Sequence, residues 1–336
     1  MIHHALPRLG AALVFAVLVA ALGPVAAGAS PADDVESGVR GWLAQTGVAD
    51  ATLAVLKDGG VVRTVGFGSW TPDQPQRIAS LSKAITGVCV ARLIDARKLA
   101  FGDTLGAVLA PTFQRLGQPA DPKFQAVTIE QLLEHRSGLP RDAVGGNHVD
   151  PTASLDDSFK RVLATPLASP PGGDMVYSNI GYLTLGMVVE AVTGQDYQSA
   201  CRALALVPMG VSAGIDPQLA ERAPNGGWMI TAADYARFVQ VFGRDNHLLN
   251  PAIHAWLEAR VGAYGMGTFV QRADDGLNFR HTGKLPPPLA GGSATMKLSN
   301  GWTAVVIYGG PPQGEDASNA LMRILRTSLG GTVAPG

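Results

Sequence analysis

The chain has 336 residues, a formal net charge of −1 and 46% hydrophobic residues. This near-neutral balance gives no basic footprint, so we exclude nucleic acid as a partner. The length is enough for one large domain or two intertwined ones, and the apolar content indicates a well-buried globular core.

The first 29 residues have the organisation of an export signal. Arg8 is the only Lys or Arg before an almost wholly apolar stretch, residues 9–22, and small residues at 27–29 follow it. This order is typical of a secretory signal peptide. We therefore predict that residues 1–29 are cleaved and that the protein is exported, to the periplasm or beyond. A permanent membrane anchor is the alternative, but the apolar core is short for a span. No later stretch is apolar enough to cross a bilayer, so we predict no stable span after cleavage.

Two cysteines, Cys89 and Cys201, remain in the chain. An exported protein could pair them. However, Cys89 lies between Val88 and Val90 in a predicted helix, which favours a free buried thiol. Neither cysteine belongs to a metal-binding motif, and we predict no metal and no cofactor.

Hydrophobic spacing and turn residues predict the elements in chain order. The N-terminal part contains a helix over 33–45, a hairpin of two strands around Asp58-Gly59-Gly60, and an apolar helix over 85–99. From 99 to about 250 the chain is helical and rich in loops. Four strands and a closing helix then follow, at 266–271, 277–281, 293–298, 302–308 and 317–329.

Strands at both ends of the chain, with helices between them, predict an α/β fold of the α+β type. We expect one antiparallel sheet, flanked by N- and C-terminal helices, with an inserted and mostly helical subdomain. Residues 30–98 and 260–330 are assigned to the sheet subdomain and 99–259 to the helical subdomain. A functional site is expected where the two parts meet.

Ser80 and Lys83 form a Ser-x-x-Lys pattern at the start of the apolar helix. Positions i and i+3 share a helix face, so the hydroxyl lies beside the amine at a helix N-terminus. A desolvated lysine there can lose its proton and activate the serine as a nucleophile. Lys83 is the only one of seven lysines with a serine three residues before it.

Two further motifs follow in a defined order. Tyr177-Ser178-Asn179 comes after the turn at 171–173, and His281-Thr282-Gly283 ends a predicted strand. The order Ser-x-x-Lys, Tyr-x-Asn and basic-x-Gly resembles that of the serine beta-lactamase and penicillin-binding protein superfamily. The similarity is to the branch that holds class C beta-lactamases, DD-peptidases, D-aminopeptidases and esterases. The segments 77–83, 128–140, 177–182 and 226–234 also match, and the resemblance from 33 to 329 implies one beta-lactamase-related catalytic domain.

The resemblance implies a role for each motif residue. Ser80 attacks a carbonyl carbon and becomes acylated, and either Lys83 or Tyr177 is the general base. Neighbouring positive charge is expected to lower the pKa of the Tyr177 phenol. Asn179 would hold Lys83 or the substrate amide.

The third motif is expected to bind the substrate, through His281 and Thr282. The oxyanion would be held by the backbone amides of Ser80 and Lys284. Gly283 has no side chain, so an acyl substrate can lie against its strand.

His281 stands where class C beta-lactamases usually carry lysine. A histidine is only partly charged near neutrality and holds a carboxylate less firmly, although Lys284 can restore a positive charge. The expected function is an exported serine hydrolase that acts through an acyl-enzyme on D-amino-acid peptides or esters. A class C-like beta-lactam hydrolase is the alternative, and a non-hydrolytic penicillin-binding or cell-wall-sensing protein is the alternative of another class. In each case the partner is a small molecule or a peptide.

A second serine motif competes with Ser80. The segment 210–214 matches the Gly-x-Ser-x-Gly nucleophile elbow, which requires a strand before the serine and a helix directly after it. Pro208 and Pro217 flank the segment, so we do not expect that geometry. Among the other polar residues, His135 is expected to be structural, and Trp228 to line either the cleft or the core.

Overall fold

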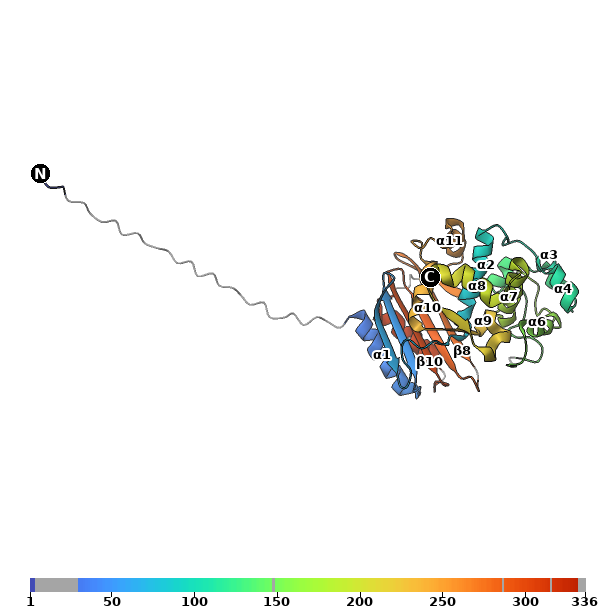
Figure 1. Cartoon of the computed structure of the whole chain (residues 1–336), viewed down its shortest axis with the longest axis horizontal. Helices are drawn as coiled ribbons and strands as arrows, with labels where there is room; N and C mark the ends of the chain where they lie inside the picture. Colours follow the sequence, from blue (N-terminus) through green and yellow to red (C-terminus); the bar gives the residue numbers. More distant parts are fainter. Residues whose placement is uncertain (4–29, 147–148, 286, 315, 332–336) are drawn as a thin grey trace.

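The computed structural model describes residues 1–3, 30–146, 149–285, 287–314 and 316–331 (Figure 1). The predicted signal peptide, residues 1–29, lies almost entirely outside the described residues. Within the described part, no helix combines the length and the apolar character that a membrane span requires.

The core of the fold is a seven-stranded antiparallel sheet in the order β2-β1-β10-β9-β8-β7-β6. The sheet combines a hairpin from the start of the chain with strands from its end. The two segments meet where β1 pairs with β10, in register from Ala51↔Tyr308 to Lys57↔Trp302. The predicted mixed fold with an antiparallel sheet is confirmed. The strands are β1 (Ala51–Lys57), β2 (Gly60–Phe67), β6 (Tyr264–Gly265), β7 (Thr268–Ala273), β8 (Gly276–Leu285), β9 (Gly291–Lys297) and β10 (Trp302–Gly309).

Two terminal helices, α1 (Pro31–Thr46) and α12 (Ala317–Ser328), cover one face of this sheet. Ser30 begins α1 in a capping box with Asp33, which satisfies backbone donors at the helix start. The Trp42 indole donates a hydrogen bond of 2.8 Å to the Ala317 carbonyl, which ties the two helices together. Both predicted helices are confirmed.

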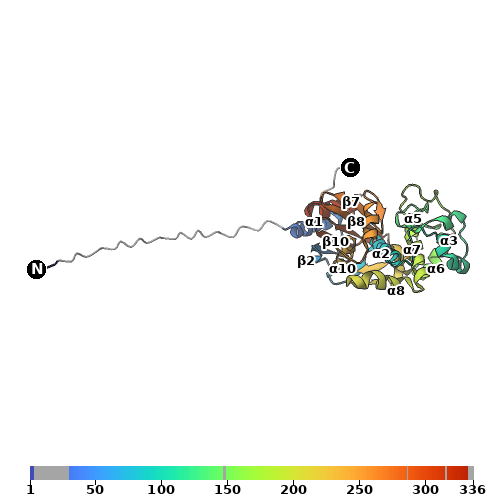
Figure 2. The same cartoon turned by 90° about the horizontal axis from the view of Figure 1, so that it is seen from above.

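The other face carries α2 (Ser82–Asp95) and α10 (Ala232–Phe238), and α10 packs on β1 and β10. Figure 2 shows α2 between the sheet and the helices beyond it. The helix α2 is buried along nearly its whole length. It ends before the predicted residue 99, because Arg97 takes a left-handed φ of 56° and the Lys98 amide bonds back to the Leu93 carbonyl.

The middle of the chain is mostly helical, as predicted. Two strands of this part, together with β3 from the N-terminal segment, form a three-stranded sheet in the order β3-β5-β4. The sequence did not indicate this sheet, because strands of two or three residues carry no periodicity. The small strands are β3 (Gln76–Arg77), β4 (Ala213–Ile215) and β5 (Trp228–Ile230). The α-helices are α3 (Leu105–Val108), α4 (Ala110–Leu116), α5 (Ile129–Leu133), α6 (Leu155–Leu163), α7 (Asn179–Thr193), α8 (Tyr197–Cys201), α9 (Ala223–Gly226) and α11 (Pro251–Glu258). The shorter helical turns are η1 (Ala79–Leu81), η2 (Pro122–Ala126), η3 (Arg202–Leu206), η4 (Val207–Met209), η5 (Pro217–Arg222) and η6 (Val239–Phe242).

The competing serine motif does not have the elbow geometry. Ser212 follows the turn η4 and precedes the strand β4, whereas an elbow needs the reverse order. Trp228 is fully buried, and its indole donates a 3.0 Å hydrogen bond to the Tyr197 hydroxyl, so it belongs to the core.

The two cysteines are paired. Cys89 of α2 and Cys201 of α8 form a disulfide with a Cα–Cα distance of 5.4 Å, so the expectation that Cys89 is a free buried thiol is wrong. The helices already meet about one turn earlier, where the Thr86 and Tyr197 hydroxyls lie 2.6 Å apart. This contact between α2 and α8 brings the two sulfur atoms within bonding distance. The sequence could not reveal it, because the cysteines are separated by 112 residues.

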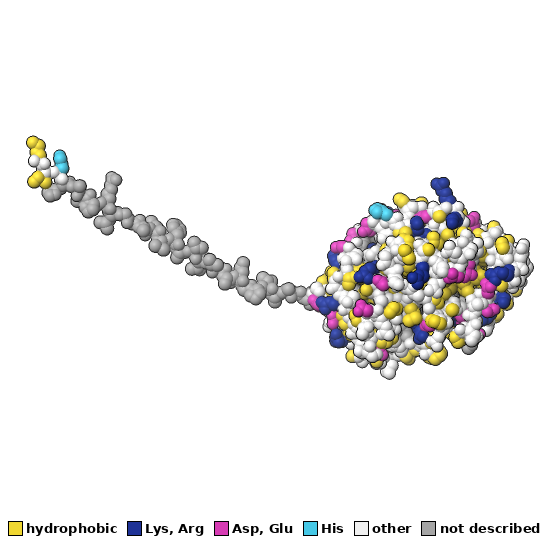
Figure 3. Space-filling model, in the orientation of Figure 1, with side chains coloured by type: hydrophobic (Ala, Val, Ile, Leu, Met, Phe, Trp, Pro, Cys, Tyr) yellow, Lys and Arg dark blue, Asp and Glu magenta, His cyan; other side chains and the backbone are white. Residues whose placement is uncertain are grey.

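Acidic and basic side chains are interspersed over the face seen in Figure 3. The surface of the protein also carries exposed ion pairs, such as Arg323 with Asp316 at 2.6 Å. The face in view therefore carries no extended patch of a single charge.

Candidate active site

Ser80 lies in the turn η1, between β3 and α2. The preceding residue, Ala79, has a left-handed φ of 48°, a conformation that costs free energy for any residue with a Cβ. Ala79 and Leu81 are buried, whereas Ser80 is partly exposed. The Ser293 hydroxyl on β9 fixes the turn by donating a 2.7 Å hydrogen bond to the Ile78 carbonyl. The strained turn thus presents the Ser80 hydroxyl at the surface of the core.

Lys83 is fully buried, and its amine has three polar neighbours. The Nζ atom lies 3.2 Å from the Ser80 hydroxyl, 2.9 Å from the Asn179 side-chain oxygen and 2.8 Å from the Asn225 carbonyl. Burial, helped by the positive charge of Arg141, holds the pKa of Lys83 well below its usual range. A neutral amine has two hydrogens and one lone pair. The two carbonyl-type oxygens accept the hydrogens, which leaves the lone pair for the Ser80 proton.

The start of α7 holds Asn179 in place. The Ser178 hydroxyl caps this helix by accepting a 3.0 Å hydrogen bond from the Gly181 amide. The Asn179 side-chain amide donates to Asp142 at 2.8 Å, which turns its oxygen towards Lys83. Asn225 and Asp142 were not among the predicted site residues. Asn225 acts through its backbone carbonyl, which has no sequence signature.

Tyr177 covers the amine, with its ring centre 4.9 Å from the Lys83 Nζ atom. Burial raises the pKa of Tyr177 to about 12, although a hydrogen bond with Ser80 and the charge of Arg141 act in the lowering direction. The expectation of a lowered pKa is therefore wrong, because desolvation outweighs the nearby positive charge. At neutral pH the phenol keeps its proton.

His281 is buried and faces the protein interior rather than solvent. Its Nε2 atom lies 3.0 Å from the Tyr264 hydroxyl, and its Nδ1 atom lies 2.6 Å from the Thr282 carbonyl. The carbonyl can only accept, so Nδ1 carries the proton and Nε2 accepts from Tyr264. Burial and the charge of Lys83 lower the pKa of His281 to about 3. The expected partial charge near neutrality is wrong, and this ring does not supply a cation for a carboxylate.

Tyr264, on β6, links the third motif to the second. It is buried, and besides its bond to His281 it shares a hydrogen bond with Tyr177. The sequence analysis missed it, because a single tyrosine outside any motif gives no signal.

The strand β8 brings the rest of the third motif against the Ser80 turn. A Cβ at Gly283 would lie 2.7 Å from the Ile78 carbonyl and 2.8 Å from the Ala79 Cβ. The space that a side chain at position 283 would need is thus filled by the turn itself, so glycine lets β8 pack closely against the turn. Close approach of β8 to this turn is the arrangement that an oxyanion hole from the Ser80 and Lys284 amides needs. Thr282 is partly exposed and Lys284 is exposed.

His135 lies beneath the site with a left-handed φ of 58°. Its Nδ1 atom accepts a 3.1 Å hydrogen bond from the Ser178 amide, and its ring centre lies 4.4 Å from those of Tyr177 and Tyr264. Burial holds the pKa of His135 well below its usual range. These contacts orient the second motif. Over the residues described, no group of three or more His, Cys, Asp or Glu is arranged to hold a metal ion.

Curated relatives match parts of the chain. Protein flp of Staphylococcus aureus (strain COL) is 28% identical over 156 residues, which are 44% of this chain and 30% of the relative. Penicillin-binding protein 4 of Amycolatopsis lactamdurans is 29% identical over 235 residues, 58% of this chain and 59% of the relative. The chain therefore spans less than two thirds of the length of either relative.

Solved structures extend the similarity to the whole fold. The beta-lactamase/D-alanine carboxypeptidase from Yersinia pestis, complexed with citrate, superposes with a TM-score of 0.73 at 18% identity, covering 89% of this chain and 98% of that one. The beta-lactamase family model matches residues 35–328. The chain therefore belongs to the beta-lactamase family.

Proposed function

We propose that this chain is an exported serine hydrolase that forms an acyl-enzyme on Ser80, with D-amino-acid peptides or esters as substrates. The contacts of the Lys83 amine carry this proposal. A buried amine that gives two hydrogens to carbonyl-type oxygens and turns its lone pair to a serine hydroxyl is arranged to accept the serine proton.

Acylation follows from this geometry. The Ser80 oxygen forms a bond to the substrate carbonyl carbon while its proton passes to Lys83. The tetrahedral intermediate then breaks the bond to the leaving group. The leaving group takes a proton from Lys83, through the Tyr177 hydroxyl, whose pKa of about 12 keeps it protonated. Lys83 returns to the neutral form.

Deacylation uses the same groups in the reverse sense. Water attacks the acyl carbon, gives one proton to neutral Lys83, and the acid product leaves as the Ser80 oxygen regains that proton. We propose that the segments 30–98 and 260–330 together form one subdomain and that the segment 99–259 forms the other. The site residues come from both subdomains of this one catalytic domain.

The charge distribution supports small acyl substrates over strongly anionic ones. His281 is neutral, so recognition of a substrate carboxylate would fall to exposed cations such as Lys284 and Arg141, whose guanidinium lies 5.7 Å from the Tyr177 ring centre. The structural similarity to a beta-lactamase/D-alanine carboxypeptidase supports the proposal that this chain acts on D-amino-acid substrates.

Four reagents test the proposal on the mature protein: a short-chain nitrophenyl ester, a D-alanyl nitroanilide, a fluorescent penicillin and a chromogenic cephalosporin. Each is compared with Ser80→Ala, and with Ser328→Ala at the end of α12 as a remote serine control. We expect turnover of the ester or the anilide that is lost in Ser80→Ala and kept in Ser328→Ala.

Other outcomes would assign a different function to the protein. Penicillin labelling without turnover of any reagent would identify a non-hydrolytic binder. Preferential hydrolysis of a chromogenic cephalosporin would identify a beta-lactam hydrolase. Turnover that survives Ser80→Ala would refute the mechanism.

A further inference from the structure

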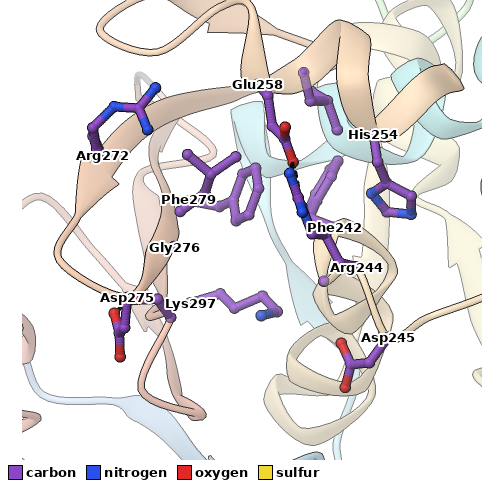
Figure 4. Close-up of a pocket in the computed structure, with 14 residues that line it drawn as sticks. Phe242, Arg244, Asp245, His254, Glu258, Arg272, Asp275, Gly276, Phe279 and Lys297 are labelled. Carbon is purple, nitrogen blue, oxygen red and sulfur yellow. Dashed lines mark hydrogen bonds and ion pairs between the residues drawn. The ribbon is translucent and has the colours of Figure 1, made fainter. Parts of the chain in front are cut away.

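A second cavity lies away from the Ser80 site. It has a volume of about 390 Å³, within the range of small-molecule sites. It opens between the segment from η6 to α11 and the turn that joins β7 to β8, near the end of β9 (Figure 4). None of Ser80, Lys83 and Tyr177 lines it.

The floor of this cavity is apolar and aromatic. The rings of Phe242 and Phe279 stack with their centres 5.2 Å apart and an angle of 23° between them. Leu257 and Leu277 continue the same surface. Phe242 and Phe279 are themselves almost fully buried, so the floor offers the apolar body of a ligand a packed surface for van der Waals contact rather than a large area to desolvate.

The side chain of Lys297 lies in the cavity, and no described residue forms a hydrogen bond or an ion pair with its amine. Lys297 ends β9, and its side chain extends across the cavity below the phenyl rings in Figure 4. Burial lowers the pKa of Lys297, and only the charge of Asp245 acts in the opposite direction. Lys297 is only half-buried, and its amine is not among the buried polar atoms without a partner, so it is open to the cavity. A carboxylate beside it would accept charge-assisted hydrogen bonds.

The backbone is shaped to admit this amine. A Cβ at Gly243 would lie 2.6 Å from the Asp245 carboxylate and 3.4 Å from the Lys297 Nζ atom. A larger residue at this position would push both groups from their places.

The other charges on the rim are mostly engaged. Arg244 forms an ion pair with Glu258, and the Ser299 hydroxyl donates to Asp275. Arg272, which is exposed, also lines the rim, and the described residues give it no ion pair. Lys297 is the half-buried cation beside the aromatic floor, and it too remains available to a ligand.

We propose that this cavity is a second, non-catalytic binding site for a small carboxylic acid with an apolar or aromatic body. The apolar body lies on Phe242 and Phe279, and the carboxylate accepts hydrogen bonds from the Lys297 ammonium. The proposal is independent of the reaction at Ser80, and its test uses protein that cannot form an acyl-enzyme.

The experiment measures binding of 3-phenylpropionate to the Ser80→Ala chain by calorimetry. The neutral 3-phenylpropanamide, which has the same shape, reports the contribution of the charge. Lys297→Met removes the cation, and Lys123→Met on the exposed turn η2 makes the same charge change elsewhere. Thermal unfolding of each variant verifies that it is folded. A crystal soaked with the acid locates the ligand without any change at Lys297.

We expect one acid to bind per chain, at least about tenfold more weakly to Lys297→Met and with unchanged affinity to Lys123→Met. The amide should also bind at least about tenfold more weakly than the acid, and the soaked crystal should show the carboxylate beside Lys297. The proposal is overturned by the absence of binding up to about 10 mM, by equal affinity for acid and amide, by affinity that Lys297→Met leaves unchanged, or by acid located only at Ser80.

Discussion

Reduction of the Cys89–Cys201 disulfide should lower the free energy of unfolding substantially. The bond closes a loop of 112 residues, and in the chain-entropy model a loop of this length contributes about 5 kcal/mol by restricting the unfolded chain. It joins α2, which carries Lys83, to α8, so reduction should also loosen the support of the amine that we propose as the catalytic base.

Urea unfolding with and without a phosphine reductant measures this contribution on one and the same chain. We expect a loss of about 2–5 kcal/mol on reduction, the usual range for such bonds. A Cys89→Ala/Cys201→Ala variant should be insensitive to the reductant. Equal unfolding free energies in the two states, or two titratable thiols in unreduced denatured protein, would refute the reasoning.

The remaining predictions concern the catalytic turn and its charges. Arg141→Gln removes a positive charge that lowers the Lys83 pKa, so that pKa should rise and the acid limb of the kcat/KM profile should move to higher pH. Arg40→Gln, with a similarly exposed side chain, should leave the profile in place, and a downward shift in Arg141→Gln would contradict the electrostatic argument. Gly283→Ala places a Cβ against the backbone of the Ser80 turn and should cost about 1–3 kcal/mol of stability together with most of the acylation rate. Gly214→Ala, where a Cβ meets nothing within 4 Å, is the control. Unfolding free energies and burst kinetics compare the two variants. Equal values for both would show that β8 can move without loss of stability or acylation rate.

Local patterns were sufficient for much of the fold. The Asp58-Gly59 turn between two apolar runs predicted the β1–β2 hairpin, and the runs 293–298 and 302–308, with a turn at 299–301 between them, predicted β9 and β10. The same holds for Ser80 and Lys83, whose contact needs only one helical turn. The short strands of the β3-β5-β4 sheet escaped, since their pairing depends on distant segments rather than on local sequence.

The chemistry of the site was harder to predict than its location. Residue types suggested a tyrosine with a lowered pKa and a partly charged histidine, but burial determines both states, and burial is a property of the assembled fold. The Asn225 carbonyl could not be identified for a similar reason, because every residue has one. Tyr264 joins Tyr177 to His281 through contacts that no single motif contains.

The pairing of β1 with β10 determines when activity can arise during synthesis. A ribosome releases β1 and the Ser80 turn early, but β1 gains its second neighbour only after residues 302–309 have emerged. Ser80 and Lys83 can meet within one helical turn, but the Ser293 hydroxyl that fixes their turn lies on β9, which pairs with β10 and emerges just before it. We therefore expect a nascent or prematurely terminated chain that lacks this last strand to carry the complete Ser-x-x-Lys motif without the proposed activity.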